Sequence, residues 1–329
     1  FDALRGLLPA ASLSNVGIYG TGQAYEALLL RMRSHPLPES RYYADLMLRE
    51  LRKVIPSFLE RVDREDRGVV WSEYLQETRE DTADVVAALF PEGSIVDPSP
   101  TVRLVDFDPE GEVKMIASMM YPHSTMSEDQ LERRVAGMNH EDRMAVARAY
   151  VGDRRNRRHK PGRALERPFY RFDVLVDYGA FRDLQRHRML SMDWQNLSPH
   201  HGYISSPLVN AAGMGAVYEE AMERSAALYD LLVDDFPDQA SYAINLAYKI
   251  RFNMNINARS AMHLIELRTT PQGHPSYREV GQEMHRLIAE EAGHTVISEM
   301  MKFVDHTDET DLERLQSERR AQEKRQSTK

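Results

Sequence analysis

Two short segments of this chain gather side chains that could bind an anionic ligand. The first is Arg186-His187-Arg188, and the second follows about 70 residues later, in the stretch from Asn257 to Arg268. Arginine donates paired hydrogen bonds to a phosphate, and histidine donates or accepts according to its protonation. Both segments are expected to be helical, and the backbone N–H groups of a helix that begins at Asn257 would also face an anion. The residues predicted to form this site are Arg186, His187, Arg188, Asn257, Arg259, His263 and Arg268.

The arginines of these segments also have a plainer interpretation. Arg186 and Arg188 could lie on a solvated helix face, paired with Asp183 or Asp193. Arg268 could be a terminal arginine of the kind that the helix macrodipole favours. The occurrence of both segments at this separation favours the binding site.

The overall charge of the chain makes this local concentration of positive charge unusual. The 329 residues include 42 Lys and Arg against 51 Asp and Glu, for a formal net charge of -9. Charged residues make up 28% and hydrophobic residues 42%, which is typical of a globular protein. No apolar run approaches the roughly 20 residues of a membrane span, and no signal peptide opens the sequence. We therefore expect a cytoplasmic location.

Cysteine is absent from the sequence. Its absence excludes disulfides, thiolate metal sites and cysteine nucleophiles. The 12 histidines show no His-Glu-x-x-His or comparable spacing, so no metal site is expected.

Strands and helices can be placed around the two segments. Residues 101–107 alternate like a strand, and a helix should follow the turn at residues 108–111. Ser127 with Gln130 predicts a capping box, and Asn139 is expected to cap the next helix. Residues 169–177 predict a strand that enters the helix bearing the Arg-His-Arg triplet. The pattern indicates an α/β chain of the α+β type, with helices around a small sheet.

The beginning of the chain resembles residues 241–300. Leu8-Pro9-Ala10 matches Ile244-Asn245-Leu246, an aliphatic run ends in arginine in both stretches, and His-Pro follows in both. Two helices of similar period can also match by chance. Each stretch closes with an apolar helical stripe, formed by Met47, Leu51, Val54, Ile55 and Phe58 in the first and by Val280, Met284, Leu287 and Ile288 in the second.

This repetition indicates the C-terminal part of a tandem protein. Residues 1–62 would be the remnant of a first unit, residues 63–100 a linker, and residues 101–309 a second unit. Residues 310–329 are highly charged, and we expect a helix there that frays into a disordered tail.

The two segments resemble the signature of the flavin-dependent thymidylate synthases, which begins Arg-His-Arg and continues to a serine. In that family a C-terminal helix starts Asn-x-Arg-Ser and ends in an aliphatic residue and arginine, as residues 257–260 and 267–268 do here. A strand of the type Glu-x-x-x-Phe-x-Phe precedes the triplet there, and Glu166 to Phe172 nearly supplies it. The resemblance covers roughly residues 101–300. It implies a small antiparallel sheet surrounded by helices, with a partial second copy at the N-terminus.

The resemblance also implies an activity, the reductive methylation of deoxyuridylate (dUMP) to thymidylate. Methylenetetrahydrofolate would donate the carbon, and reduced FAD, recharged by NADPH, would provide the hydride. Arg268 would polarise the uracil ring so that its C5 becomes nucleophilic. The implied FAD ligands are Arg186, His187, Arg188, Asn257, Arg259 and His263, and the implied substrate ligands are Arg186, Asn196, Ser198, Arg268 and Arg5.

The loop after the triplet departs from the family pattern. Trp194 stands where the family has a flavin-contacting glutamate, Ser198 is one place too far along, and the arginine before Tyr203 is absent. Ser241 replaces a phosphate-binding arginine whose counterpart in the first stretch is Arg5. One account is a composite site that combines a nucleotide half from the first unit with a flavin half from the second. The other is a catalytically degenerate second unit. Either account fits a homo-oligomer or a tandem pseudo-oligomer.

The basic run from Arg154 to Lys160 suggests a different class of function. Its density is compatible with contact to a nucleic-acid backbone. The acidic net charge and the lack of a recognisable module or interleaved aromatic residues make nucleic-acid binding the less favoured hypothesis. The alternative is a loop that receives the pyrophosphate of the flavin or faces water.

Overall fold

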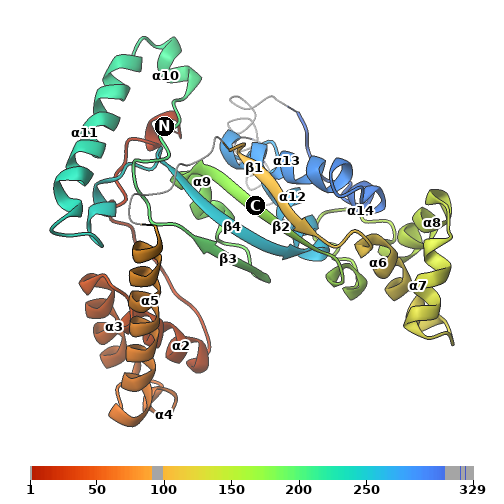
Figure 1. Cartoon of the computed structure of the whole chain (residues 1–329), viewed down its shortest axis with the longest axis horizontal. Coiled ribbons are helices and arrows are strands. Elements are labelled where there is room, and N and C mark those ends of the chain that lie inside the picture. Colours follow the sequence, from red (N-terminus) through yellow and green to blue (C-terminus); the bar gives the residue numbers. More distant parts are fainter. Residues whose placement is uncertain (1, 91–98, 308–318, 320–322, 324–329) are drawn as a thin grey trace. The chain divides into compact units, whose positions relative to one another are not determined.

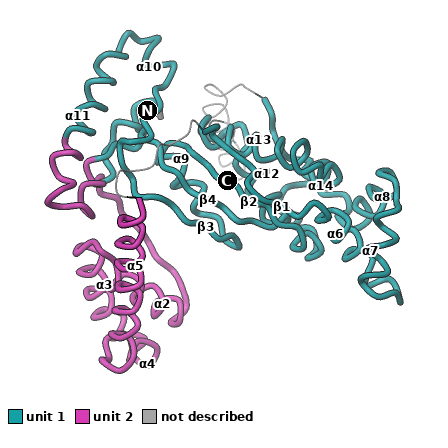
Figure 2. The backbone as a smooth tube through the Cα atoms, viewed as in Figure 1, with its two compact units in different colours: residues 1–10, 99–227, 244–329 teal, residues 11–98, 228–243 magenta. Residues whose placement is uncertain are grey.

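A computed structural model describes residues 2–90, 99–307, 319 and 323. The chain divides into two compact units (Figure 2). The first combines residues 1–10, 99–227 and 244–329, and the second combines residues 11–98 and 228–243. None of the helices in the described part of the chain has the length and apolar character needed to cross a membrane.

A four-stranded antiparallel sheet forms the centre of the first unit (Figure 1). Its order is β1-β2-β4-β3. The expected small antiparallel sheet is therefore confirmed, and so are the two strands predicted near residues 101–107 and 169–177. The strands are β1 (Val102–Phe107), β2 (Phe169–Asp177), β3 (Leu190–Trp194) and β4 (Lys249–Asn257).

One face of this sheet is apolar because side chains alternate along the two central strands. Phe172 of β2 pairs with Met254 of β4, Val174 pairs with Phe252, and all four side chains are buried. Helices pack on β1, β2 and β4, and they bury this face. These helices are α9 (Tyr178–Leu184), α12 (Ala258–Arg268) and α13 (Pro275–Glu290).

The helices between β1 and β2 begin where the sequence predicts. Asn139 caps α8, since its Oδ1 accepts a hydrogen bond from the backbone N–H of Asp142 at 2.8 Å. The capping box of Ser127 and Gln130 opens α7. The turn after β1 leads into a helix as expected. These helices are α6 (Gly111–Met120), α7 (Glu128–Ala136) and α8 (His140–Val151).

The other elements of the first unit are mostly short. They are α1 (Asp2–Arg5), the 3-10 turns Tyr121–His123 and Arg163–Glu166, α10 (Pro207–Ala211), the start of α11 (Gly215–Val233), and α14 (Thr295–Met300).

Residues 6–10 pair with the stretch that leads into β4. Pro9 and Asn245 form an isolated antiparallel bridge. On either side of it, the backbone N–H of Ala10 donates to Ile244 O at 2.8 Å, and that of Leu246 donates to Leu8 O at 2.8 Å. The stretches that sequence comparison matched as equivalents, Leu8-Pro9-Ala10 and Ile244-Asn245-Leu246, are thus hydrogen-bonded to each other.

The second unit is helical, with a core of Leu29, Ala44, Leu48, Leu59 and Val62. Its elements are α2 (Gly22–Arg33), α3 (Pro38–Leu51), α4 (Pro56–Leu59), a π-helical turn (Glu65–Val69), α5 (Val70–Leu89) and the 3-10 turn Ala240–Ala243.

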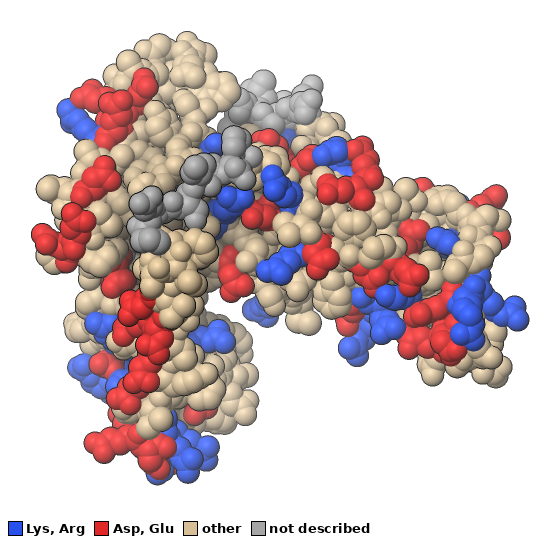
Figure 3. Space-filling model, viewed as in Figure 1, with Lys and Arg blue, Asp and Glu red and all other residues tan. Residues whose placement is uncertain are grey.

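Two expectations for the second unit differ from the structure. The apolar stripe from Met47 to Phe58 does not belong to one helix, because α3 ends at Leu51 and Pro56 disfavours helical geometry at Ile55. Most of the segment expected to be a linker, residues 63–100, is helical up to Leu89. Acidic side chains gather along α5 (Figure 3).

The remaining expectations about organisation stay predictions. The charged tail, residues 310–329, lies outside the described residues apart from isolated positions, and so do residues 91–98 of the expected linker. That residues 1–62 are a partial copy also remains a prediction.

Candidate functional site

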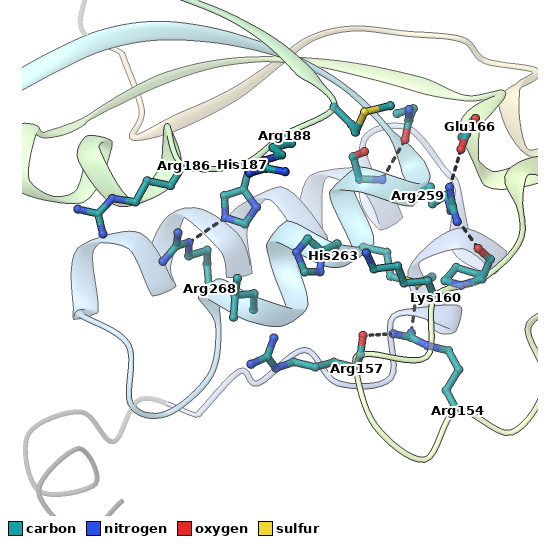
Figure 4. A pocket seen from close by; sticks show the side chains of 16 residues that line it. Arg154, Arg157, Lys160, Glu166, Arg186, His187, Arg188, Arg259, His263 and Arg268 are labelled. Carbon is teal, nitrogen blue, oxygen red and sulfur yellow. Dashed lines mark hydrogen bonds and ion pairs between the residues drawn. The ribbon is translucent and has the colours of Figure 1, made fainter. Parts of the chain in front are cut away.

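A pocket of about 430 Å³ brings the two predicted segments together (Figure 4). Six arginines and one lysine line it against a single glutamate, in a chain with a net charge of -9. Such a lining favours anions. The lining residues are Arg154, Arg157, Lys160, Pro161, Glu166, Arg186, His187, Arg188, Met189, Asn257, Arg259, Ser260, Met262, His263, Leu267 and Arg268.

Helix α12 supplies one wall of the pocket. Asn257 is both the last residue of β4 and the N-cap of α12, and its Oδ1 accepts a hydrogen bond from the backbone N–H of Ser260 at 2.9 Å. Arg259 and His263 are four residues apart and therefore share a face of the helix, which lines the pocket. The opposite face is apolar and buried in the core. The sequence prediction of this capped helix, ending at Arg268, is confirmed.

The Arg-His-Arg triplet does not lie in a helix, contrary to the sequence prediction. Helix α9 ends at Leu184, and residues 186–189 form the turn that leads into β3. The turn is needed because β3 must run antiparallel to β4, with Leu190 opposite Ile256. With this register, the turn that holds the triplet lies beside the start of α12. Met189, at the end of the turn, has a positive φ of 63°, which is uncommon for a residue with a Cβ.

Arg268 joins the two segments at one side of the pocket. Its Nε donates a hydrogen bond to His187 Nε2 at 2.9 Å, and its guanidinium also binds the backbone carbonyl of Asp183. The Asp183 carboxylate lies 3.4 Å from both Arg268 and Arg186. The ring of Tyr277 packs 5.3 Å from the Arg268 guanidinium carbon. Arg268 is therefore fixed in one orientation.

Asp183 forms ion pairs with both Arg186 and Arg268, whereas the sequence suggested a pair only with the arginines of the triplet. The ion pair with Arg186 that the plainer interpretation anticipated is present, but the Arg186 side chain is 66% exposed and the pair is weak. The Asp183 pair with Arg268 is more enclosed, because the Arg268 side chain is 14% exposed. The carboxylate thus lowers the positive potential at the position where catalysis was predicted.

His187 is neutral at physiological pH in this setting. Burial, then the positive charge of Arg268, then His263 lower the pKa of His187 to about 4. Because Arg268 donates to its Nε2, the remaining ring proton must sit on Nδ1. Burial and the charges of Lys160, Arg157 and Arg268 also lower the pKa of His263, whose ring centre lies 5.8 Å from that of His187.

The stability of the protein should depend on pH through His187. The unfolded chain binds a proton near the ordinary pKa of 6.5, whereas the folded chain binds it near 4. His187 therefore lowers the free energy of unfolding as pH falls from 6.5 to about 4, by at most about 3 kcal/mol. In urea unfolding at pH 7.5 and 4.5, His187→Gln should lose less stability than the unsubstituted protein. Equal losses in both proteins would contradict this assignment.

Arg259 forms the opposite side of the pocket. Its Nη1 donates to Glu166 Oε1 at 2.7 Å, and its Nε donates to Pro161 O at 2.9 Å. These bonds attach the start of α12 to the basic loop that precedes β2. Two side chains of this loop, Arg157 and Lys160, extend into the pocket (Figure 4).

Three predicted substrate ligands lie elsewhere. Asn196 is exposed, and Ser198 is 8% exposed, with its Oγ accepting a hydrogen bond from the backbone N–H of His200 at 3.4 Å. Arg5 ends the short helix α1. None of the three is among the described residues that line the pocket. Their roles in substrate binding stay predictions.

Several residues in or beside the pocket had other assignments in the sequence. Asp183 was considered as a partner of the triplet and Glu166 as part of a strand motif. Arg157 and Lys160 belong to the basic run, for which a loop that receives the flavin pyrophosphate was one of the alternatives. Among the residues that the structure describes, no group of three or more His, Cys, Asp or Glu side chains is arranged to hold a metal ion.

Comparison with known families gives a match over most of the first unit. The family model described as thymidylate synthase complementing protein matches residues 103–293. A UPF0159 protein from Chlamydia pneumoniae is 39% identical over 321 residues, covering 97% of this chain and 60% of that protein. A UPF0159 protein from Thermoplasma acidophilum is 30% identical over 326 residues, covering 96% and 62% respectively. The chain therefore spans about three fifths of the length of these relatives.

Solved structures give more distant matches. A UMP/dUMP methylase from Streptomyces cacaoi, bound with 5-Br dUMP, has 18% identity and a TM-score of 0.47, covering 62% of this chain and 97% of that one. Thymidylate Synthase X from Helicobacter pylori, with FAD and dUMP, has 17% identity and a TM-score of 0.45, covering 61% and 99%.

Proposed function

Because this chain belongs to the thymidylate synthase complementing protein family, we propose that it takes part in flavin-dependent thymidylate synthesis. The proposed reaction is the reductive methylation of dUMP to thymidylate, with methylenetetrahydrofolate as carbon donor and NADPH as source of reducing equivalents. The assembly would be a homo-oligomer or a tandem pseudo-oligomer, and the proposed location is the cytoplasm.

One observation carries this proposal. The pocket joins the Arg-His-Arg triplet to α12, although the two are separated by about 70 residues of sequence. The hydrogen bond from Arg268 to His187 links the two segments directly. Two unrelated surface motifs would not be expected to line one cationic pocket.

The donor chemistry of the pocket fits FAD. The pyrophosphate of FAD is anionic, and both guanidinium groups and the start of α12 offer N–H donors to such a group. Reduced FAD supplies the hydride when it is bound. The proposed FAD ligands are Arg186, His187, Arg188, Asn257, Arg259 and His263.

Arg268 is the proposed catalytic residue. A guanidinium held in place by Asp183 and His187 needs little rearrangement to stabilise negative charge that develops on a uracil ring. His187, being neutral, accepts from Arg268 and does not compete with it for the anion. The Asp183 carboxylate lowers the positive potential at Arg268, and the bond to the Asp183 carbonyl orients the guanidinium.

The origin of the nucleotide-binding half distinguishes two versions of the proposal. Since Asn196, Ser198 and Arg5 do not line the pocket, a composite site would need nucleotide ligands from the first copy of the tandem, with Arg5 as the candidate, to be brought to it. In the other version, this chain is a flavin-binding or structural partner without turnover of its own.

Similar local geometry in the two stretches supports a duplication. Thr21 caps α2 as Asn257 caps α12. The Nδ1 of His35 accepts a backbone hydrogen bond from Leu37 near the start of α3, and His274 accepts one from Ser276 in α13. Thr21 precedes Asn257 by the same number of residues as Pro9 precedes Asn245. One alignment of the two stretches therefore matches both the helix caps and the residues Pro9 and Asn245, which pair with each other.

The test is to purify the chain and look for flavin. We expect a yellow protein whose visible spectrum is that of bound FAD, and whose flavin fluorescence changes on titration. Thymidylate formation is then assayed with dUMP, methylenetetrahydrofolate and NADPH. Turnover that is lost in Arg5→Ala supports the composite site. Flavin binding without turnover supports the partner version, and a protein that binds no FAD contradicts both.

A further inference from the structure

The basic loop between α8 and β2 has fixed ends. It begins at Gly152, which has a φ of +67° that favours glycine, and it closes at Gly162. A Cβ at Gly162 would lie 2.1 Å from the hydroxyl oxygen of Tyr150, so the chain approaches that ring closely. The same hydroxyl accepts a hydrogen bond from the backbone N–H of Ala164 at 3.1 Å. Residues 152–162 therefore have a defined path over α12.

Arg154 of this loop is buried in an ion pair. It is 3% exposed, and its partner, Glu266 of α12, is fully buried. The pair is bidentate, with Arg154 Nη1 donating to Glu266 Oε1 at 2.6 Å and Nη2 donating to Oε2 at 2.5 Å. This geometry gives the strongest kind of charge-assisted hydrogen bond.

The other bonds of Arg154 hold its own loop. Its Nε donates to the carbonyl of His159 at 2.8 Å, and Nη2 lies 3.4 Å from the carbonyl of Arg157. Nη1 also approaches Met300 O at 3.4 Å, and the ring of Phe303 lies 5.2 Å from the guanidinium carbon. The guanidinium is therefore committed to protein groups, and its contribution to ligand binding has to be indirect.

The carbonyls that Arg154 binds belong to the part of the loop that faces the pocket. Arg157 and Lys160 line the pocket, and Figure 4 shows Lys160 extending from the loop toward His263. Arg155 and Arg158 are exposed, and the pocket lining within the described chain does not include them. Arg154 also borders the pocket, but its guanidinium is bound to Glu266. The basic run thus splits into one buried residue held in an ion pair, two residues whose charges are available to the pocket and two that face water.

We propose that Arg154 is a positioning residue, whose buried pair with Glu266 holds the loop so that Arg157 and Lys160 bind a phosphate-class group of the ligand. The inference rests on the proposed function only in taking FAD as the physiological ligand. Arg157 and Lys160 are the direct contacts, and Arg154 acts through the loop carbonyls.

A variant that replaces both partners of the ion pair by apolar side chains is expected to keep the fold. Replacing a buried ion pair by apolar side chains of similar volume is often neutral or stabilising, whereas removing one partner leaves a buried charge. The variant Arg154→Met/Glu266→Met therefore separates positioning from stability. Arg157→Gln/Lys160→Gln removes the direct contacts. Arg155→Gln/Arg158→Gln removes the same amount of charge from the same loop, outside the pocket, and is the matched control.

The experiment compares FAD with riboflavin, which lacks phosphate, by fluorescence titration of each variant. We expect FAD affinity to fall about tenfold or more in Arg154→Met/Glu266→Met and in Arg157→Gln/Lys160→Gln. The affinity of both variants for riboflavin should stay within about twofold of that of the unsubstituted protein. The control should bind FAD nearly as the unsubstituted protein does. A folded Met variant with unchanged FAD affinity overturns the positioning role. Equal losses in the control and the pocket variant overturn the assignment of Arg157 and Lys160.

Inorganic pyrophosphate separates this inference from the proposed function. Pyrophosphate should raise the Tm of the unsubstituted protein and of the control, and should not raise that of Arg157→Gln/Lys160→Gln. This pattern without FAD binding contradicts the proposed function and leaves the anion site intact. FAD binding that is indifferent to all these substitutions contradicts the inference and leaves the function intact.

Discussion

Arg268→Ala is expected to reduce thymidylate formation by about 100- to 1,000-fold, the usual loss when a preorganised donor to a developing negative charge is removed. Arg268 is held by His187 and by the carbonyl of Asp183, so its charge is in place before substrate binds. The effect should appear mainly in kcat. The rate is measured with saturating dUMP, methylenetetrahydrofolate and NADPH in the assembly that shows turnover.

Two further variants make the result specific. Arg268→Lys keeps the charge but loses the fixed fork of donors, and it should recover only part of the rate. Arg182→Ala removes an exposed arginine from the last turn of α9, one residue before Asp183, and should leave the rate unchanged. An Arg268→Ala protein with full activity would contradict the catalytic assignment and the composite site together.

Glu266→Ala should be the most destabilising single substitution in this region. It leaves Arg154 charged in a buried place without its partner, and the cost of such a change is about 3–5 kcal/mol. For a folding unit of this size, the Tm should fall by about 10 °C. Urea unfolding and thermal scans in the absence of ligand measure the effect.

The matched comparison is an exposed ion pair. Glu290 pairs with Arg286 on the surface of α13, and Glu290→Ala should cost about 0.5 kcal/mol or less. Stability should return when Arg154→Met accompanies Glu266→Met. If Glu266→Ala lost less than about 1 kcal/mol, Arg154 would have to be able to leave its buried position, and the loop would not be held by it.

Local sequence signals predicted the elements whose ends are defined by residues close to them in sequence. Strand β2 and the capped start of α12 could be recognised because side-chain alternation and capping side chains act within a few residues. Strand β4 shows an equally clear alternation of Ile250, Phe252, Met254 and Ile256, but it was not predicted.

The elements that were wrong or missed depend on partners distant in sequence. The triplet looked helical because α9 precedes it, yet pairing of β3 with β4 forces the chain to turn there. Likewise, a basic run read along the sequence gives no sign that Arg154 finds Glu266 more than 100 residues later. A single acid inside the aliphatic run of α12 was the available signal, since a buried carboxylate requires a partner.

The bridge between Pro9 and Asn245 has a consequence for the order of folding. Synthesis from the N-terminus completes residues 6–10 long before residues 244–247 exist. Closing so long a loop carries an entropic cost, so this pairing should form late, after β2 and β4 have met. Until then the backbone groups of residues 6–10 must be bound by water or by another protein. Residues made well before the sheet would thus be among the last to reach their final place.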